Sequence, residues 1–178
     1  SQFTDIDPWL INPYFEKLDN LNFQERKGEN ELASIASNML KNINKKYKQY
    51  NIAQEAYLVV KANAGTYGMG IMIIKNSEDI LNLNRKMRKK MSVIKGGAIV
   101  TEVIIQEGIH TEESIDESVA EPVIYMIDRF VVGGFFRVHT NKEKDENLNS
   151  PGMHFIPQPF ETSCIMPDQG RPCDDEAN

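Results

Sequence analysis

The sequence has 178 residues, of which 40% are hydrophobic and 26% charged, a composition typical of one soluble globular domain. Its net charge of −6 argues against nonspecific nucleic-acid binding, and no apolar run approaches the ~20 residues that span a membrane. The two cysteines, Cys164 and Cys173, make no disulfide framework and favour a cytoplasmic location. We expect one folded domain over residues 1–166 and a disordered polar tail over residues 167–178.

The N-terminal part predicts one amphipathic helix. Residues 1–30 are irregular, with Pro13 suited to the first position of a helix. Between Asn30 and Tyr50, apolar residues recur at steps of three and four, which predicts one buried helical stripe. The residues of that stripe are Leu32, Ile35, Ala36, Met39, Ile43 and Tyr47.

Two Val- and Ile-rich runs, 57–61 and 70–75, predict strands that flank a glycine-rich loop, and Lys61 ends the first run. Glycine lets backbone N–H groups approach a phosphate closely, and a lysine ammonium adds a point charge against its oxygens. The loop is long for a bare β-hairpin, but a plain hairpin connection is the alternative. The glycines of this loop are Gly65, Gly68 and Gly70.

A second helix is expected from a cap at Ser77 to about Met91, and its end, Arg85 to Lys90, is rich in cations. Two interpretations stay open. The cations can form a solvated face that complements the negative end of the helix dipole. Alternatively, they can dock an anionic partner.

Three further runs, Ala98–Glu107, Val119–Asp128 and Phe130–Thr140, are rich in Val, Ile, Phe and Tyr and predict strands. Between the last two there is room only for a tight hairpin turn at Asp128-Arg129. Within the third run, Gly133-Gly134 predicts a bulge or the close approach of a ligand. The order of elements predicts an α+β fold in which helices pack on an antiparallel sheet.

Polar residues at the end of the run 98–107 form one candidate site, Gln106-Glu107-Gly108. A strand end that turns outward can bind an adenine edge, and a carboxylate can accept hydrogen bonds from ribose hydroxyls. An ordinary strand end is the alternative.

Arg137 and His139 alternate on one face of the third of these strands, with Phe135 on the same face. An arginine beside aromatic residues is costly to bury unless it meets an anion, such as phosphate or carboxylate. A structural ion pair with Glu121 or Asp128 explains the same pattern equally well.

An oxygen-rich cluster follows, made of Asp145, Glu146, Asn147 and Asn149. Carboxylate and amide oxygens are ligands that Mg²⁺ prefers, with phosphates completing its shell. The same composition also suits a solvated turn.

The order of a lysine strand, a glycine loop, a Gln-Glu strand end, an inward arginine and an acid/amide loop resembles the ATP-grasp fold. One family, the proteobacterial glutamate–cysteine ligase or γ-glutamylcysteine synthetase, is similar over about Asp5 to Phe160. The sequence segments that carry the resemblance are D-P-W-L-I-N-P-Y-F-E-K, V-K-A-N-A-G-T-Y-G-M-G-I-M, I-I-Q-E-G, A-E-P-V-I-Y-M-I-D-R-F-V-V-G-G-F-F-R-V-H-T and E-N-L-N-S-P-G-M.

The resemblance implies an ATP-grasp-like antiparallel sheet with packed helices and a glycine-rich flap over a nucleotide cleft. It implies that ATP phosphorylates the γ-carboxylate of glutamate and that the amine of cysteine attacks the acyl phosphate, the first step of glutathione synthesis. The expected partners are these small molecules, with no nucleic acid and no membrane.

The resemblance also implies residue roles. Lys61 and the flap would bind the phosphates of ATP, and Arg137 would stabilise charge on the transferring phosphoryl group. The flap residues would be Gly65, Thr66, Tyr67, Gly68 and Gly70. The adenine hinge would be formed by Gln106, Glu107 and Ile109, and Mg²⁺ or substrate would be oriented by Glu146, Asn147 and Asn149.

Two departures from the family pattern stand out. Family members usually carry Asp where this sequence has Asn63, and their chain is over twice as long. The sequence therefore looks like a C-terminal-half fragment, with much of the amino-acid recognition expected elsewhere. Two other functions stay open: ligation of another carboxylate–amine pair, and a non-catalytic anion- or nucleotide-binding module that uses residues 85–90.

Overall fold

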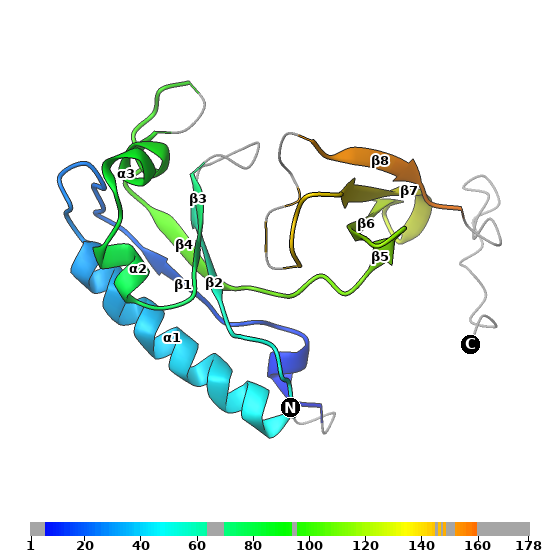
Figure 1. The fold of residues 1–178 in the computed structure, drawn as a ribbon, viewed down its shortest axis with the longest axis horizontal. Helices are drawn as coiled ribbons and strands as arrows, with labels where there is room; N and C mark the ends of the chain where they lie inside the picture. Colours follow the sequence, from blue (N-terminus) through cyan, green and yellow to red (C-terminus); the bar gives the residue numbers. More distant parts are fainter. Residues whose placement is uncertain are drawn as a thin grey trace. The chain divides into compact units, whose positions relative to one another are not determined.

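The computed structural model describes residues 6–63, 70–93, 96–144, 146, 148 and 152–159, and the chain divides into two compact units. The first unit spans Ser1–Ile109 and the second His110–Asn178, and each is described by itself. Each contains one four-stranded antiparallel sheet, and the helices of the described ranges all belong to the first unit (Figure 1). The expected α+β class is confirmed. The expected tail, 167–178, lies outside the described residues.

The first sheet has the strand order β1-β4-β2-β3. Its strands are β1 (Phe15–Leu18), β4 (Val103–Glu107), β2 (Leu58–Ala62) and β3 (Ile71–Ile74). The predicted strands on either side of the glycine loop are present and pair with each other. The strand expected from Ala98 begins only at Val103, and β1 lies in the segment expected to be irregular. Because β4 lies between β1 and β2, three segments far apart in the sequence meet in one sheet.

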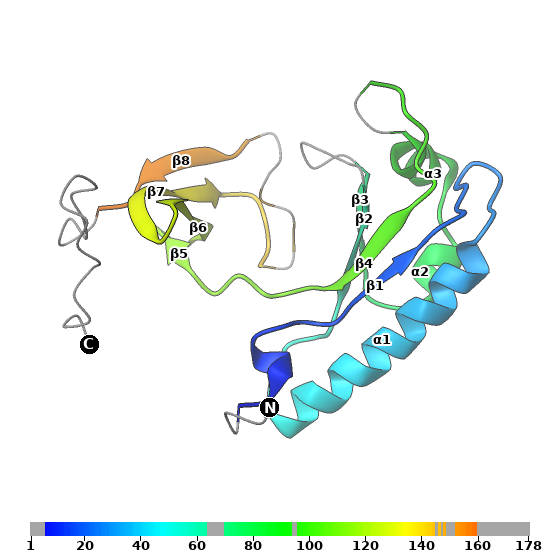
Figure 2. The same cartoon turned by 180° about the vertical axis from the view of Figure 1, so that it is seen from behind.

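Helix α1 (Glu29–Gln49) covers one face of the first sheet (Figures 1 and 2). The predicted stripe is confirmed, because five of its six residues are buried and Ile35 is half-buried against the same core. The helix begins after Gly28, whose φ is +81° and where an added Cβ would lie 2.8 Å from the side chain of Leu21. Glycine is therefore required at this start.

The second predicted helix is wrong as a single element. The structure has α2 (Glu78–Leu81) and α3 (Arg85–Ser92), with a break between them. Ser77 makes no capping hydrogen bond. The side chain of Asn84 caps α3 instead, because its Oδ1 accepts from the backbone N–H of Met87 at 2.9 Å.

The second sheet has the order β5-β6-β7-β8. Its strands are β5 (Ser114–Ile115), β6 (Ser118–Ile127), β7 (Phe130–His139) and β8 (His154–Pro157). The predicted hairpin turn is confirmed between β6 and β7, with Asp128 at a φ of +54°. The predicted bulge is also confirmed: Tyr125 pairs with Gly133 and Met126 with Val131, which leaves Val132 as the extra residue.

Among the helices in the described ranges, none combines the length and apolar character that crossing a lipid bilayer requires.

Candidate functional site

The face of the first sheet opposite α1 carries two of the expected nucleotide residues. Buried and half-buried residues alternate along β2 and β4, which places Lys61 and Gln106 together on this face. Nζ of Lys61 donates a hydrogen bond to Oε1 of Gln106 over 2.9 Å. In the part of the chain that the structure describes, no carboxylate pairs with Lys61. Since an ammonium has three N–H donors, its charge and two donors stay available to an anion.

Apolar side chains surround this pair. Residues directly opposite one another in a sheet share a face, so the strand register shows which side chains lie beside Lys61 and Gln106. The apolar neighbours are Phe15, Val59, Ile71, Ile73 and Ile104. Lys17 lies opposite Ile104 on the same face and pairs with Glu102 at 2.7 Å. A largely apolar floor around the Gln106 amide and the Lys61 ammonium suits a ligand that has a flat base and a charged group.

The ends of the glycine loop are fixed to the sheet. The carbonyl of Gly70, which has a φ of +64°, accepts a hydrogen bond from the N–H of Ala62 at 3.1 Å. At the other end, the backbone N–H of Asn63 donates to the carbonyl of Glu102 at 3.1 Å, and its side-chain amide donates to the Glu102 carboxylate. The expected flap residues between these ends, Gly65, Thr66, Tyr67 and Gly68, lie outside the described residues.

The side chain of Glu107 lies on the other face of the sheet, away from Lys61 and Gln106. It is buried, and its Oε2 accepts from Nε1 of Trp9 at 2.9 Å and from the N–H of Tyr14 at 3.0 Å. Burial raises the pKa of the Tyr47 hydroxyl, and the negative charge of Glu107 raises it further. Glu107 therefore anchors the N-terminal segment to the sheet.

The backbone after β4 is held by Tyr57. The N–H of Gly108 donates to the Tyr57 carbonyl at 2.9 Å, and the Tyr57 hydroxyl donates to the carbonyl of Ile109 at 2.7 Å. A Cβ added at Gly108 would lie 2.0 Å from the Tyr57 ring, so glycine is required there. The side chain of Ile109 is exposed. The expected hinge segment thus has a fixed backbone.

Arg137 lies in the second unit and makes the ion pair that the sequence left open. Its Nη1 donates to Oε2 of Glu121, directly opposite on β6, at 2.7 Å. Its Nε is buried and has no hydrogen-bond partner among the described residues. Tyr125, Phe135 and Phe155 form an aromatic row on the same face, with ring centroids 5.0 to 5.8 Å apart. The guanidinium therefore keeps one unsatisfied donor beside aromatic rings.

His139 is buried near the end of β7. Its Nδ1 accepts from the N–H of Asn141 at 3.3 Å. A Cβ added at Gly152 would lie 3.2 Å from its ring. The ring is thus held by the loop next to it.

Glu146 has partners on both carboxylate oxygens. Oε1 accepts from Nζ of Lys142 at 2.7 Å, and Oε2 accepts from the N–H of Glu143 at 2.9 Å. Asn147 and Asn149 lie outside the described residues. Over the described ranges, no group of three His, Cys, Asp or Glu side chains is placed to hold a metal ion. The expected Mg²⁺ site stays a prediction.

Comparison with known proteins decides the family. The family model for glutamate–cysteine ligase (GshA) matches residues 1–178. The chain belongs to the glutamate–cysteine ligase family. It is also similar to a crystal structure from Methylobacillus flagellatus KT, of a protein provisionally named gamma-glutamylcysteine synthetase, with 55% identity and a TM-score of 0.76. That match covers 97% of this chain and 41% of the other. None of the curated proteins matches this sequence.

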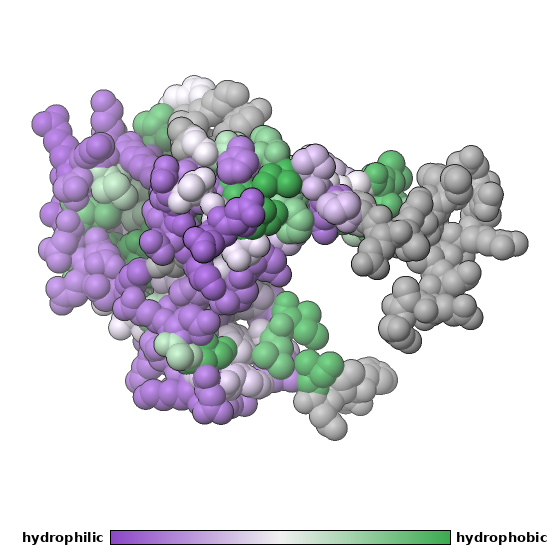
Figure 3. All heavy atoms as spheres, turned by 45° about the vertical axis from the view of Figure 1, so that its right-hand side comes forward, coloured by the Kyte–Doolittle hydropathy of each residue, from purple (hydrophilic) through white to green (hydrophobic). Residues whose placement is uncertain are grey.

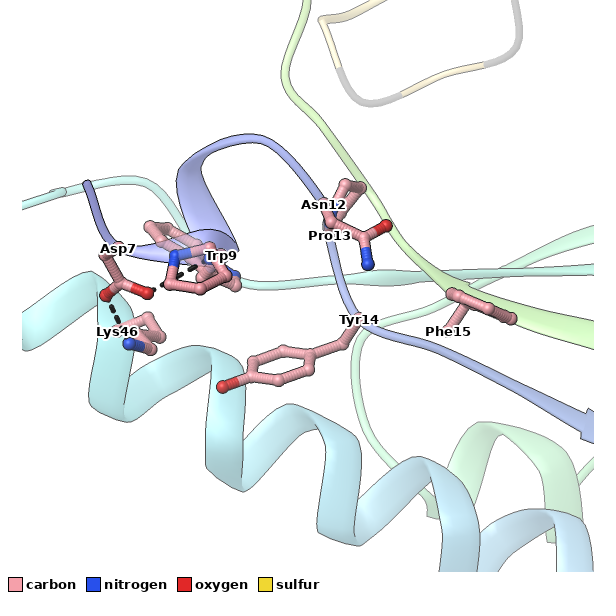
Figure 4. Close-up of a pocket in the computed structure, with 8 residues that line it drawn as sticks. Asp7, Trp9, Asn12, Pro13, Tyr14, Phe15 and Lys46 are labelled. Atoms are coloured by element: carbon pink, nitrogen blue, oxygen red, sulfur yellow. Dashed lines mark hydrogen bonds and ion pairs between the residues drawn. The ribbon is translucent and has the colours of Figure 1, made fainter. Parts of the chain in front are cut away.

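In this member of the glutamate–cysteine ligase family, residues of the segment D-P-W-L-I-N-P-Y-F-E-K line a pocket of about 350 Å³ against α1 (Figure 4). Asp7 caps the 3₁₀ helix η1 (Pro8–Leu10), and its carboxylate accepts from Nζ of Lys46 and from the hydroxyl of Tyr50. These hydrogen bonds, with one from the N–H of Trp9, lower the pKa of Asp7 to about 2. The Trp9 ring stacks on Tyr50, with centroids 5.4 Å apart.

Sequence reasoning missed this pocket, because the contacts that form it join Asp7 and Trp9 to Lys46 and Tyr50, about forty positions further along the sequence. Hydrophobic residues gather around the same N-terminal segment (Figure 3), and its exposed large apolar side chains are Ile6, Leu10, Ile11 and Phe15.

Proposed function

We propose that this chain carries the nucleotide-binding part of an ATP-dependent glutamate–cysteine ligase with an ATP-grasp-like fold. A γ-carboxylate oxygen of glutamate attacks the γ-phosphorus of ATP, and the bond to ADP breaks. The amine of cysteine then attacks the acyl carbon, phosphate leaves, and the nitrogen loses a proton as the amide forms. Membership of the family supports the ligase chemistry.

The observation that carries the proposal is the hydrogen bond between Lys61 and Gln106 on the half-exposed face of the first sheet. The uncompensated ammonium of Lys61 binds phosphate oxygens, and the apolar floor around it takes the base. Gln106 keeps the ammonium on this face because the Gln106 amide oxygen accepts a hydrogen bond from Nζ of Lys61. The glycine flap between Asn63 and Gly70 supplies backbone N–H groups to the same phosphates.

Arg137 acts on the anionic reactants. Its guanidinium has one nitrogen on Glu121 and a buried Nε that lacks a partner among the described residues, a donor that an oxyanion satisfies. Glu146, Asn147 and Asn149 would be the residues that hold Mg²⁺ or orient the substrate. Bound Mg²⁺ would supply charge neutralisation between the phosphates.

The experiment is a calorimetric titration of the intact protein with ATP·Mg²⁺, with and without glutamate, followed by a phosphate-release assay. Phosphate release requires both glutamate and cysteine if the proposal is right. Lys61→Ala should lower the rate on the order of 100-fold, because it removes charge stabilisation of a few kcal/mol from the transition state. Lys45→Ala is the matched control, since Lys45 is an exposed lysine of α1 away from this face, and it should leave the rate unchanged.

The substrates are tested by replacement. Phosphate release that needs a different carboxylate or amine would keep the acyl-phosphate chemistry but overturn the assignment of glutamate and cysteine. Phosphate release that ignores every amino acid, or a Lys61→Ala variant as active as Lys45→Ala, would overturn the ligase proposal.

A further inference from the structure

An open cavity of about 390 Å³ lies where α3 meets the turn between β1 and α1. Its lining residues are Gln24, Arg85, Arg88 and Lys89. Arg88 and Lys89 follow Arg85 by three and four positions, so the three cations share one side of α3. Met87 and Met91, on its other side, pack against the core and hold that cationic side outward. Among the described residues, the charged side chains that line the cavity are all positive.

The break before α3 removes the simplest explanation of the cation at its start, although Lys89 remains in the last turn, where a cation is favoured. In a helix that started at Ser77, Arg85 and Arg88 would lie near the C-terminal end, where cations are favoured. In the structure Arg85 is the first residue of α3, and the first turn contains no acidic residue. Cations there face the positive end of the helix dipole and are disfavoured. A local preference that is broken in this way often marks a functional site.

The charges that line this cavity are also uncompensated. Among the described residues, neither Arg85 nor Lys89 forms an ion pair or hydrogen bond through its side chain. Arg88 uses Nη1 to donate to the carbonyl of Leu83, which fixes its guanidinium without neutralising it. By contrast, Arg26 in the adjoining turn pairs with Glu29, its Nε lying 2.7 Å from Oε2. Glu29 is thus paired with Arg26 and not with the cations that line the cavity.

We propose that this cavity binds a small multivalent oxyanion of the phosphate class. Two guanidinium groups match the geometry of phosphate oxygens, and an ammonium adds a third charge. Three positive charges exceed the single negative charge of a carboxylate and so favour a multivalent anion. The volume of the cavity is within the range of small-molecule sites. The cavity shares no residue with the face that carries Lys61 and Gln106. It is therefore a second anion site, and it does not depend on the ligase proposal.

The test is calorimetry with sodium pyrophosphate on protein that carries Lys61→Ala, so that the proposed nucleotide face cannot account for the binding. The expected result is saturable binding of one pyrophosphate per chain. Adding Arg85→Gln and Lys89→Gln together should weaken it roughly 100-fold, because two charge-assisted contacts are lost. Adding Lys86→Gln and Lys90→Gln removes the same charge from the same helix but outside the cavity lining, and should change affinity less than about threefold.

Parallel titrations with inorganic phosphate and with glycerol 3-phosphate distinguish a free anion from a phosphate ester as the preferred form. The side chains of Arg85 and Lys89 are exposed, so both double variants should melt at the temperature of their parent. Absence of saturable binding of all three probes, or equal weakening by the two double variants, would overturn the proposal. Because the parent already lacks Lys61, absence of pyrophosphate binding would not bear on the ligase proposal. Failure of the ligase proposal would likewise not bear on this anion site.

Discussion

Lys61 and Gln106 are 45 positions apart in the sequence, yet Nζ of the lysine lies 2.9 Å from Oε1 of the glutamine. The contact runs diagonally between β2 and β4, because Lys61 is opposite Ile104 and Gln106 is opposite Val59. The partner of the ammonium is thus a neutral oxygen, which positions the charge without cancelling it. A carboxylate at the same place would form an ion pair and compete with phosphate.

Gln106→Glu should therefore weaken ATP binding by about tenfold, a loss of about 1.4 kcal/mol. The new carboxylate pairs with Lys61 and repels the phosphates. Gln106→Met is the matched control, because it removes the hydrogen bond but leaves the ammonium uncompensated, and its effect should be under about threefold. Calorimetric titration with ATP·Mg²⁺ measures both variants. Equal affinities for Gln106→Glu and the unmodified protein would show that this face does not bind the phosphates.

Glu107 should matter for stability. Glu107→Ala leaves the indole N–H of Trp9 and the backbone N–H of Tyr14 without their acceptor, which should cost about 1–3 kcal/mol of unfolding free energy. Glu107→Gln keeps one acceptor oxygen and should cost less than about 1 kcal/mol. Trp9 is the only tryptophan in the sequence, so its fluorescence during urea unfolding reports on this contact. If the alanine and glutamine variants unfold at the same urea concentration, the anchoring role is refuted.

The elements that the sequence predicted well depend on local patterns. The stripe of α1 repeats over about four turns. The turn at Asp128 between two long apolar runs permits only one hairpin. The break at Asn84 was missed because it depends on one side chain capping the helix, while the apolar and charged residues around it continue the helical pattern.

The site was predictable only in part. Lys61 and Gln106 were each singled out, but their contact follows from β4 lying between β1 and β2, which spacing alone does not reveal. The orientation of Glu107 was also hidden. Val103, Ile104 and Ile105 are all apolar, so the sequence does not show which residues of this strand face the core.

Gly108 should not tolerate a side chain. In Gly108→Ala the new Cβ would meet the ring of Tyr57, and relief of that clash should cost about 1–3 kcal/mol of unfolding free energy. The same substitution in a Tyr57→Ala background should cost less than about 0.5 kcal/mol beyond Tyr57→Ala itself, since the obstructing ring is gone. Gly133→Ala is the matched control, because no atom lies within 4 Å of its added Cβ. Additive costs at Gly108 and Tyr57 in urea unfolding would contradict the proposed clash.

Asp7 should make stability depend on pH in the acid range. Its pKa is lowered from 3.8 to about 2 by hydrogen bonds from Lys46, Tyr50 and the N–H of Trp9, so the folded state favours the ionised form. The resulting stabilisation is fully present above pH of about 4 and is lost as the pH falls toward 2. Asp7→Asn should remove this contribution, so its melting temperature should fall less steeply than that of the unmodified protein between those values. Asp19→Asn, an exposed aspartate outside this network, should keep the steeper fall. Parallel curves for Asp7→Asn and the unmodified protein would mean that Asp7 does not link the N-terminal segment to α1 in solution.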